Sequence, residues 1–144
     1  MPLGGLLSGL IDTGAILAIL ESDDEWHLPC VEALGSVRFP LLTTEAVLTE
    51  LFHLVGSNPR KVAQAWDFLR SGSIALRAIN DPDLPSLRAL MAQYADRPMD
   101  FADATLVHVA AREFISVILT VDRDDFETYR LPRNKKFDIL PRRL

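Results

Sequence analysis

Four acidic residues in this chain have the chemical type and the placement to bind a metal ion together. They are Asp12, Glu50, Asp103 and Asp122. Two of them come directly after apolar runs, residues 6–11 and 116–121, that are typical of buried strands. Because ligands of open α/β sheets bind outside the carboxyl ends of the strands, these two carboxylates are expected at one rim of a sheet.

Asp103 is the most informative of the four, because it interrupts an apolar helix face. On a helix over residues 101–112, the polar side chains of Thr105, His108 and Arg112 gather on one side, and Asp103 lies almost opposite them. A buried carboxylate is costly unless it is paired or bound to a metal. The structural alternative is a buried salt bridge or a cap on a neighbouring element.

The other three acids each have an ordinary structural interpretation when taken alone. Glu50 sits at the border of the apolar arc of an expected helix over Glu45–Val55 and could be a boundary residue. Asp12 could cap the helix that follows it. Asp122 could be a turn residue.

Taken together, the four acids favour a metal site. Like charges that converge on one rim repel one another and raise their own pKa values, and a fold keeps such a cluster when it coordinates a hard cation. Oxygen-only ligands suit Mg²⁺ or Mn²⁺ rather than zinc. The three histidines, His27, His53 and His108, are scattered. A single cysteine, Cys30, excludes a disulfide framework and a Cys-cluster zinc site, and it is expected to be buried.

The elements that must position these acids alternate between strand-like and helix-like segments, which predicts an α/β fold with a parallel sheet. Strands are expected at residues 6–11, 39–42, 73–79, 116–121 and 137–140. Helices are expected at Thr13–Leu20, 25–34, Glu45–Val55, from Asn58 and Pro59 to a stop at Gly72, 85–94 and 101–112. Asp12, Thr43 or Thr44, Asn58 and Asp100 are the expected helix caps.

The amino-acid composition and charge limit the classes of protein to which the chain can belong. The chain has 144 residues, 49% of them hydrophobic and 24% charged, which suits one globular domain. The net charge of −5 does not favour a nucleic-acid binder, but residues 123–144 hold seven of the 15 Lys and Arg and four of the 20 acids. No Lys or Arg precedes Arg38, and Asp12 interrupts the apolar start, so we expect a cytoplasmic protein without signal peptide or membrane anchor.

Four segments resemble the PIN domain, and the last resembles VapC-type toxins in particular. They are LIDTGAILAIL with Asp12, TTEAVLTELFHLV with Glu50, MDFADATLVHVAARE with Asp103, and ILTVDRDDF with Asp122. No single motif is specific, but the order Asp, Glu, Asp, Asp in these strand and helix contexts is. The resemblance spans residues 6–140, nearly the whole chain.

The resemblance implies a three-layer α/β/α sandwich in which residues 1–144 form a single PIN-like nuclease domain. It implies a metal-dependent endoribonuclease, the toxin of a toxin–antitoxin pair, that acts on RNA, forms a homodimer and binds an antitoxin protein. Asp12, Glu50, Asp103 and Asp122 would hold one or two Mg²⁺ or Mn²⁺ ions. The accessory residues would be Thr13, Asp100 and Asp125. The RNA backbone would meet Arg123, Arg130, Arg133, Lys135 and Lys136.

Other readings of an α/β fold are less consistent with the residues. An Asp-nucleophile phosphatase or dehalogenase needs an Asp-x-Asp motif after the first strand or a Lys near the last strands. Here Thr13 and Gly14 follow Asp12, and residues 113–134 contain no Lys. A receiver-like module needs paired early acids, and no acid precedes Asp12. A non-catalytic RNA-binding or scaffold PIN domain, or a housekeeping PIN nuclease without an antitoxin, stays open as the alternative.

Overall fold

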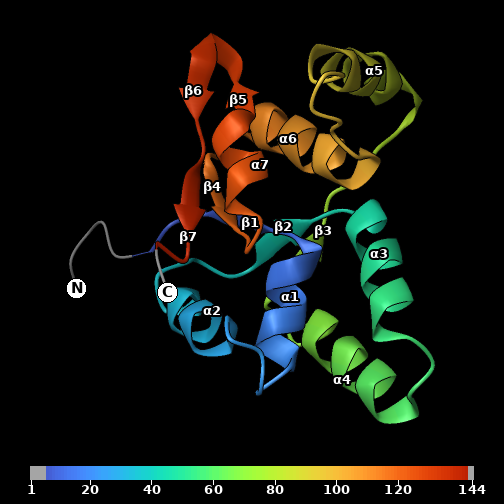
Figure 1. The fold of residues 1–144 in the computed structure, drawn as a ribbon, viewed down its shortest axis with the longest axis vertical. Coiled ribbons are helices and arrows are strands. Elements are labelled where there is room, and N and C mark those ends of the chain that lie inside the picture. The colour runs from blue at the N-terminus through green and yellow to red at the C-terminus, as the bar shows by residue number, and fades with distance from the viewer. Residues whose placement is uncertain (1–5, 143–144) are drawn as a thin grey trace.

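The protein, described by a computed structural model over residues 6–142, is built around a five-stranded parallel sheet (Figure 1). The strand order is β3-β2-β1-β4-β7. The strands are β1 (Gly9–Ile11), β2 (Leu41–Thr43), β3 (Ile74–Leu76), β4 (Val117–Leu119) and β7 (Asp138–Leu140). All four neighbouring pairs are parallel, with Leu10 of β1 opposite Leu42 of β2 and Ile118 of β4.

Helices cover both sides of this sheet, as Figure 1 shows. The α-helices are α1 (Thr13–Leu20), α2 (His27–Leu34), α3 (Glu45–Val55), α4 (Pro59–Leu69), α5 (Leu84–Gln93), α6 (Phe101–Glu113) and α7 (Arg123–Thr128). In this view α1, α2 and α4 lie below the sheet, and α5 and α6 lie above it. The predicted α/β fold with a mainly parallel central sheet is therefore confirmed.

The strand order creates one switch point in the sheet. From β1 the chain builds outward to β2 and β3 in one direction, and later to β4 and β7 in the other. The carboxyl ends of β1 and β4 therefore lie side by side with their connections leaving in opposite directions, which is where open α/β sheets leave a crevice for ligands. Asp12 follows β1 and Thr120 follows β4.

The core is apolar except beside that crevice. Leu10, Ile11, Ile118 and Leu119 of the two central strands are fully buried. Within residues 6–142, the buried polar or charged residues are Asp12, Thr13, Thr43, Thr44, Thr105 and Thr120. Because buried polar groups must find partners, their concentration near the strand ends indicates a built polar site. Cys30 is buried, as expected.

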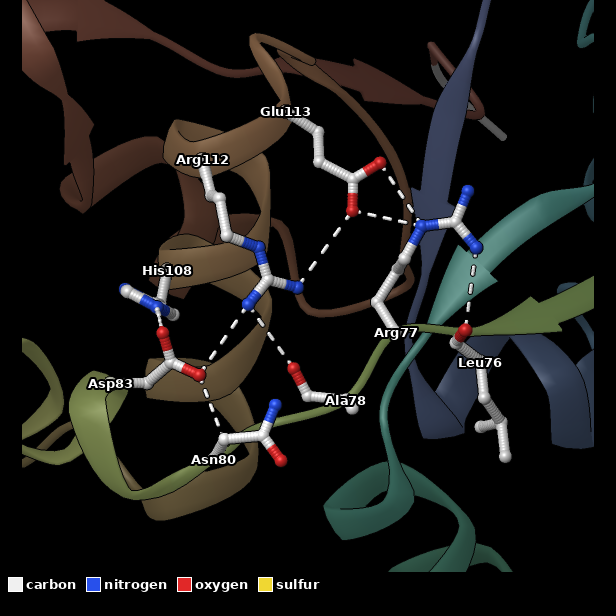
Figure 2. Close-up of polar contacts among 8 residues, drawn as sticks. All are labelled: Leu76, Arg77, Ala78, Asn80, Asp83, His108, Arg112 and Glu113. Atoms are coloured by element: carbon white, nitrogen blue, oxygen red, sulfur yellow. Dashed lines mark hydrogen bonds and ion pairs between the residues drawn. The ribbon is translucent and has the colours of Figure 1, made fainter.

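A network of ion pairs fixes the connection after β3 against α6 (Figure 2). Arg77, just beyond β3, pairs with Glu113 at 2.9 Å. Asp83, in the 3-10 turn η1 (Asp81–Asp83), accepts from His108 Nε2 at 3.0 Å and pairs with Arg112 at 3.5 Å. These contacts hold the loop between β3 and α5 along the polar side of α6, so the opposite side of α6 faces the core and the crevice.

The carboxyl-terminal part contains elements that the sequence did not predict. Residues beyond β4 form the short helix α7 and a small antiparallel hairpin of β5 (Arg130–Leu131) and β6 (Lys135–Lys136), joined by the turn η2 (Pro132–Asn134). Arg143, one of the basic residues counted in this part, lies outside the described residues. Across residues 6–142, no helix has the length and apolar character needed to cross a membrane.

Candidate metal centre

A small cavity of about 80 Å³ opens where β1 and β4 end. Its lining includes five carboxylates, Asp12, Glu50, Asp100, Asp103 and Asp122. They come from four separate places in the fold: the end of β1, helix α3, the start of α6 and the start of α7. Among residues 6–142, no Lys, Arg or His lines this cavity, so the negative charges meet no cationic side chain there.

Asp12 is held by two donors at the end of β1. It is only 7% exposed, and its Oδ1 accepts from the backbone N–H of Ala15 at 3.3 Å, the expected cap of α1. Its Oδ2 accepts from the hydroxyl of Thr120 at 2.5 Å. Burial raises the pKa of Asp12 to about 7, and the charges of Asp122 and Glu50 raise it further against these hydrogen bonds.

Thr120 joins the ends of the two central strands, and sequence reasoning assigned it no role. Its hydroxyl donates to Asp12 and accepts from the backbone N–H of Asp122 at 2.9 Å. The side chain is fully buried. One residue therefore sets the orientation of the Asp12 carboxylate and the backbone that carries Asp122. The available signal was a hydroxyl residue at the end of an apolar strand, two positions before an acid.

Asp103 is half-buried on the first turn of α6, in keeping with its position on an apolar arc. Its Oδ2 accepts from the hydroxyl of Tyr129 at 2.7 Å. Burial raises the pKa of Asp103 to about 8, and the neighbouring Asp100, Asp12 and Asp125 add to the shift. No Lys, Arg or His in the described range forms an ion pair with Asp103, so the salt-bridge alternative is not what the structure has.

Tyr129 is the second partner that sequence reasoning missed. Its ring is 1% exposed and packs edge-on against Tyr94 at 5.1 Å and Phe126 at 5.2 Å between ring centres. A ring locked on two sides leaves the hydroxyl little freedom to turn away from Asp103. The position of Asp103 is therefore controlled from the junction of α7 and β5, 26 residues further along the chain.

Asp122 and Glu50 form the open side of the cavity. Both side chains are exposed. The pKa of Asp122 is raised by partial burial and then by the charge of Asp125, Asp100 and Asp124. Glu50 lies on the exposed border of α3, and its charge raises the pKa of Asp12 across the cavity. The four predicted acids thus line one hollow, two of them anchored inside and two at its mouth.

The donor set fits a hard divalent cation. Five carboxylates without a cationic neighbour supply only oxygen ligands, the type that Mg²⁺ and Mn²⁺ prefer. A hollow of about 80 Å³ has room for an ion and one or two waters, since a water occupies ~30 Å³ in the liquid. In the present side-chain positions, no three His, Cys, Asp or Glu of the described residues are grouped closely enough to hold a metal. Asp12 and Asp103 instead turn to Thr120 and Tyr129.

The three accessory residues lie at different distances from this hollow. Thr13 lines it, but its hydroxyl points to the carbonyl of Val47 at 3.4 Å. Asp100 lines it and caps α6 through the backbone N–H of Asp103 at 2.7 Å. Asp125 lies outside the lining and pairs with Arg97 at 3.3 Å.

Gly14 is a further lining residue that sequence reasoning did not single out. A Cβ placed on it would approach Cγ2 of Val121 to 2.7 Å, closer than real side chains come. Val121 stands between Thr120 and Asp122, and its branched side chain has few alternative rotamers, so it gives way less easily than a long flexible side chain. Gly14 therefore allows α1 to start close against the end of β4.

The basic residues predicted to meet RNA do not line the cavity. Two of them use donors within the chain: Arg123 donates to the carbonyl of Pro141 at 2.6 Å, and Arg130 donates to the carbonyls of residues 127, 128 and 129. Three others are exposed on the β5–β6 hairpin: Arg133, Lys135 and Lys136.

Comparison with known proteins gives consistent matches. The family model of the PIN domain matches residues 9–131. The chain is 27% identical over 134 residues to Ribonuclease VapC26 of Mycobacterium tuberculosis. The aligned region covers 92% of this chain and 99% of that protein. It is also similar to the crystal structure of VapC20 from the same organism, described as a Sarcin-Ricin loop cleaving toxin. That match has a TM-score of 0.71 at 19% identity over 82% of this chain and 94% of that one.

Proposed function

This chain belongs to the PIN-domain family, and we propose that it is a divalent-metal-dependent endoribonuclease, the toxin of a toxin–antitoxin pair. The observation that carries the proposal is the cavity at the ends of β1 and β4, lined by five carboxylates. Gathering so many acids at one crevice costs stability in the metal-free protein, and folds keep such a cost where the site has a function. The similarity to Ribonuclease VapC26 extends over 92% of the chain and supports the same activity.

Divalent-metal dependence is general for PIN-domain ribonucleases. We propose that Asp12, Glu50, Asp103 and Asp122 hold one or two Mg²⁺ or Mn²⁺ ions. When bound, such an ion supplies a Lewis acid for the phosphodiester and lowers the pKa of a water that attacks it. The chain's own residues prepare this site: Thr120 orients the Asp12 carboxylate and Tyr129 orients Asp103. Asp100, Thr13 and Asp125 are the accessory residues of the proposal.

The substrate side of the proposal is an RNA backbone met by exposed cations. Arg133, Lys135 and Lys136 are free to contact phosphates as point charges or forks. Arg123 and Arg130 also belong to the predicted set. Some of their N–H groups donate to backbone carbonyls, so they would act on the RNA mainly through their positive charge. The charges of the five acids would be offset by bound metal, which lowers the negative field that RNA meets.

We propose that residues 1–144 form one PIN-like domain, which binds an antitoxin protein and forms a homodimer in the cytoplasm. Large apolar side chains are exposed on α2, α3 and α4, among them Leu28, Leu54 and Trp66, at 69%, 57% and 50%. Where such side chains form a contiguous patch, the surface is typical of a protein interface. Light scattering at micromolar concentration is expected to give the mass of two chains, and a monomer would contradict the dimer.

A cleavage assay tests the proposed activity. Purified protein is incubated with RNA in Mg²⁺ or Mn²⁺ and in EDTA, beside an Asp103→Asn variant whose fold is checked by circular dichroism. Cleavage is expected with metal, none in EDTA, and a loss of orders of magnitude in the variant, because metal-bound carboxylates act as one unit. Full activity in EDTA would contradict the metal mechanism. Metal-dependent RNA binding without cleavage would favour a non-catalytic PIN domain instead.

A further inference from the structure

A second and larger hollow adjoins the carboxylate cavity. It measures about 690 Å³ and lies between α3 and α6, closed on one side by Ile79 of the loop after β3. Glu50 and Ala102 line both hollows, so the two are direct neighbours. The volume is within the range of small-molecule sites, roughly 300–1,000 Å³. A ligand bound at the Glu50 and Ala102 end of this hollow would lie beside the proposed metal site.

One wall of this hollow is an aromatic ring that the chain itself leaves unstacked. Phe101, the first residue of α6, is 47% exposed and stands between the cap Asp100 and Ala102. Within residues 6–142 it forms no aromatic pair, although Phe52, Tyr94, Phe126 and Tyr129 all do. The half-buried Ile79 adds a second apolar surface. An open aromatic face beside an apolar side chain is what a nucleobase stacks on.

The polar part of the lining decides which part of a nucleotide fits. Glu45 and Glu50 are both acidic, and no Lys or Arg of the described residues lines the hollow, so a phosphate would be repelled. A base is uncharged. Its exocyclic amino group can donate to a carboxylate, as cytosine N4 does to Glu or Asp in nucleic-acid complexes. The exposed His53 offers a further hydrogen-bonding group, and the hydroxyl of Thr49, which donates to the carbonyl of Glu45 at 3.1 Å, can still accept.

We infer that this hollow is a base-binding subsite, in which the nucleobase beside the scissile bond stacks on Phe101 and donates an amino hydrogen to Glu45. The inference rests on the proposed endoribonuclease activity. It deepens that activity by naming a specificity determinant: adenine, cytosine and guanine carry an exocyclic amino group and are accepted, and uracil is disfavoured.

The test compares Phe101→Ala, Phe101→Trp and Glu45→Ala with the parent on a pool of RNAs of random sequence, with the cut sites mapped by sequencing. Phe101→Ala is expected to raise KM roughly 5- to 150-fold, the factor that one lost base stack gives, with a smaller effect on kcat. It should also erase the sequence preference at one position next to the cut. Phe101→Trp should restore both, and Glu45→Ala should admit uracil.

A matched control lies at the other end of the same helix. Phe114 directly follows α6 and is 95% exposed, remote from the lining, so Phe114→Ala should leave KM and the cut sites unchanged. Phe101→Ala with the KM and cut sites of the parent would overturn the subsite.

A binding measurement separates this outcome from failure of the proposed function. Fluorescence anisotropy with short 2′-O-methyl RNAs of each base, added to the Asp103→Asn protein with and without Phe101→Ala, needs no cleavage. Weaker binding by the Phe101→Ala protein supports the subsite even if the parent proves inactive. Equal binding of all four bases by both proteins would contradict it.

Discussion

The hydroxyl of Tyr129 donates a hydrogen bond of 2.7 Å to Oδ2 of Asp103. The bond links the junction of α7 and β5 to the first turn of α6, and it is made by a ring that is itself fixed between Tyr94 and Phe126. Groups that orient a metal-binding carboxylate in this way tune its affinity without touching the ion. Tyr129 is therefore a positioning residue for the proposed site.

Replacing Tyr129 by Phe removes this hydrogen bond and keeps the ring packing. We expect Mn²⁺ affinity and RNA cleavage to fall about 10- to 100-fold, the usual effect of losing a group that orients a metal ligand. Calorimetric Mn²⁺ titration and cleavage rates measure both. The matched control is Tyr94→Phe, because the Tyr94 hydroxyl accepts from the backbone N–H of Arg130 and touches no acid. A Tyr129→Phe protein that binds Mn²⁺ as the parent does would show that Tyr129 does not position a metal ligand.

Thr120→Val is the corresponding change at Asp12. Valine fills the same space, so the loss is that of the hydroxyl that donates to Asp12 and accepts from the N–H of Asp122. We expect a loss of Mn²⁺ affinity of about 10-fold or more, restored by Thr120→Ser. Thr43→Val is the control: its buried hydroxyl donates to the carbonyl of Ile11 at 2.9 Å, so stability should fall while metal affinity holds. Equal losses of affinity in both variants would argue for a general structural effect.

The sequence predicts the fold better than it predicts the partners of the acids. Helices Thr13–Leu20 and Glu45–Val55 match their predicted bounds because a cap-type residue before each helix and an apolar period along it are visible in the local sequence. The helix α7 escaped prediction because six residues dense in charge carry no such period. The partners Thr120 and Tyr129 lie 108 and 26 residues from the acids that they hold, and no local pattern encodes such contacts.

Two smaller differences between the predicted and observed structure also arise from contacts between residues far apart in the sequence. Thr44 stands at the predicted cap position of α3, but its hydroxyl pairs with that of Thr105, 61 residues away, at 2.8 Å. The strand expected at residues 6–11 narrows to Gly9–Ile11, since Leu7 pairs only with Val37 in an isolated bridge. The position of Asp103 on an apolar arc, in contrast, is a local property, and the helix wheel predicted its partial burial.

Removing the charge of Asp103 should stabilise the metal-free protein. Asparagine still accepts from Tyr129 but carries no charge next to Asp12 and Asp100, which both raise the pKa of Asp103. We expect Asp103→Asn to raise the melting temperature in EDTA by roughly 3–5 °C, which corresponds to about 1 kcal/mol. Mn²⁺ should stabilise the parent by mass action and the variant much less. A variant that melts well below the parent in EDTA would make Asp103 a structural residue.

The stability of the metal-free protein should fall as pH rises from about 4 to about 8. Asp12 and Asp103 have pKa values of about 7 and about 8 in the folded protein and near 3.8 in the unfolded chain. Between pH 4 and pH 8 the folded state holds more protons than the unfolded chain, so raising the pH favours unfolding. Above pH 8 the loss of stability levels off. Urea unfolding in EDTA across this range measures it. An Asp12→Asn/Asp103→Asn double variant should give a flatter profile, and a parent profile that rises with pH would contradict the assignment.

A calorimetric titration with Mn²⁺ at pH 7.5 tests, without RNA, whether four carboxylates from separate elements bind one metal centre. The parent should bind one or two ions. The single variants Asp12→Asn, Glu50→Gln, Asp103→Asn and Asp122→Asn should each lose affinity at least 10-fold while remaining folded. Asp81→Asn, an exposed acid in η1 that does not line the cavity, should bind as the parent does. If the parent does not bind Mn²⁺, or if folded Asp12→Asn and Asp103→Asn proteins bind it as the parent does, these carboxylates do not form the metal centre.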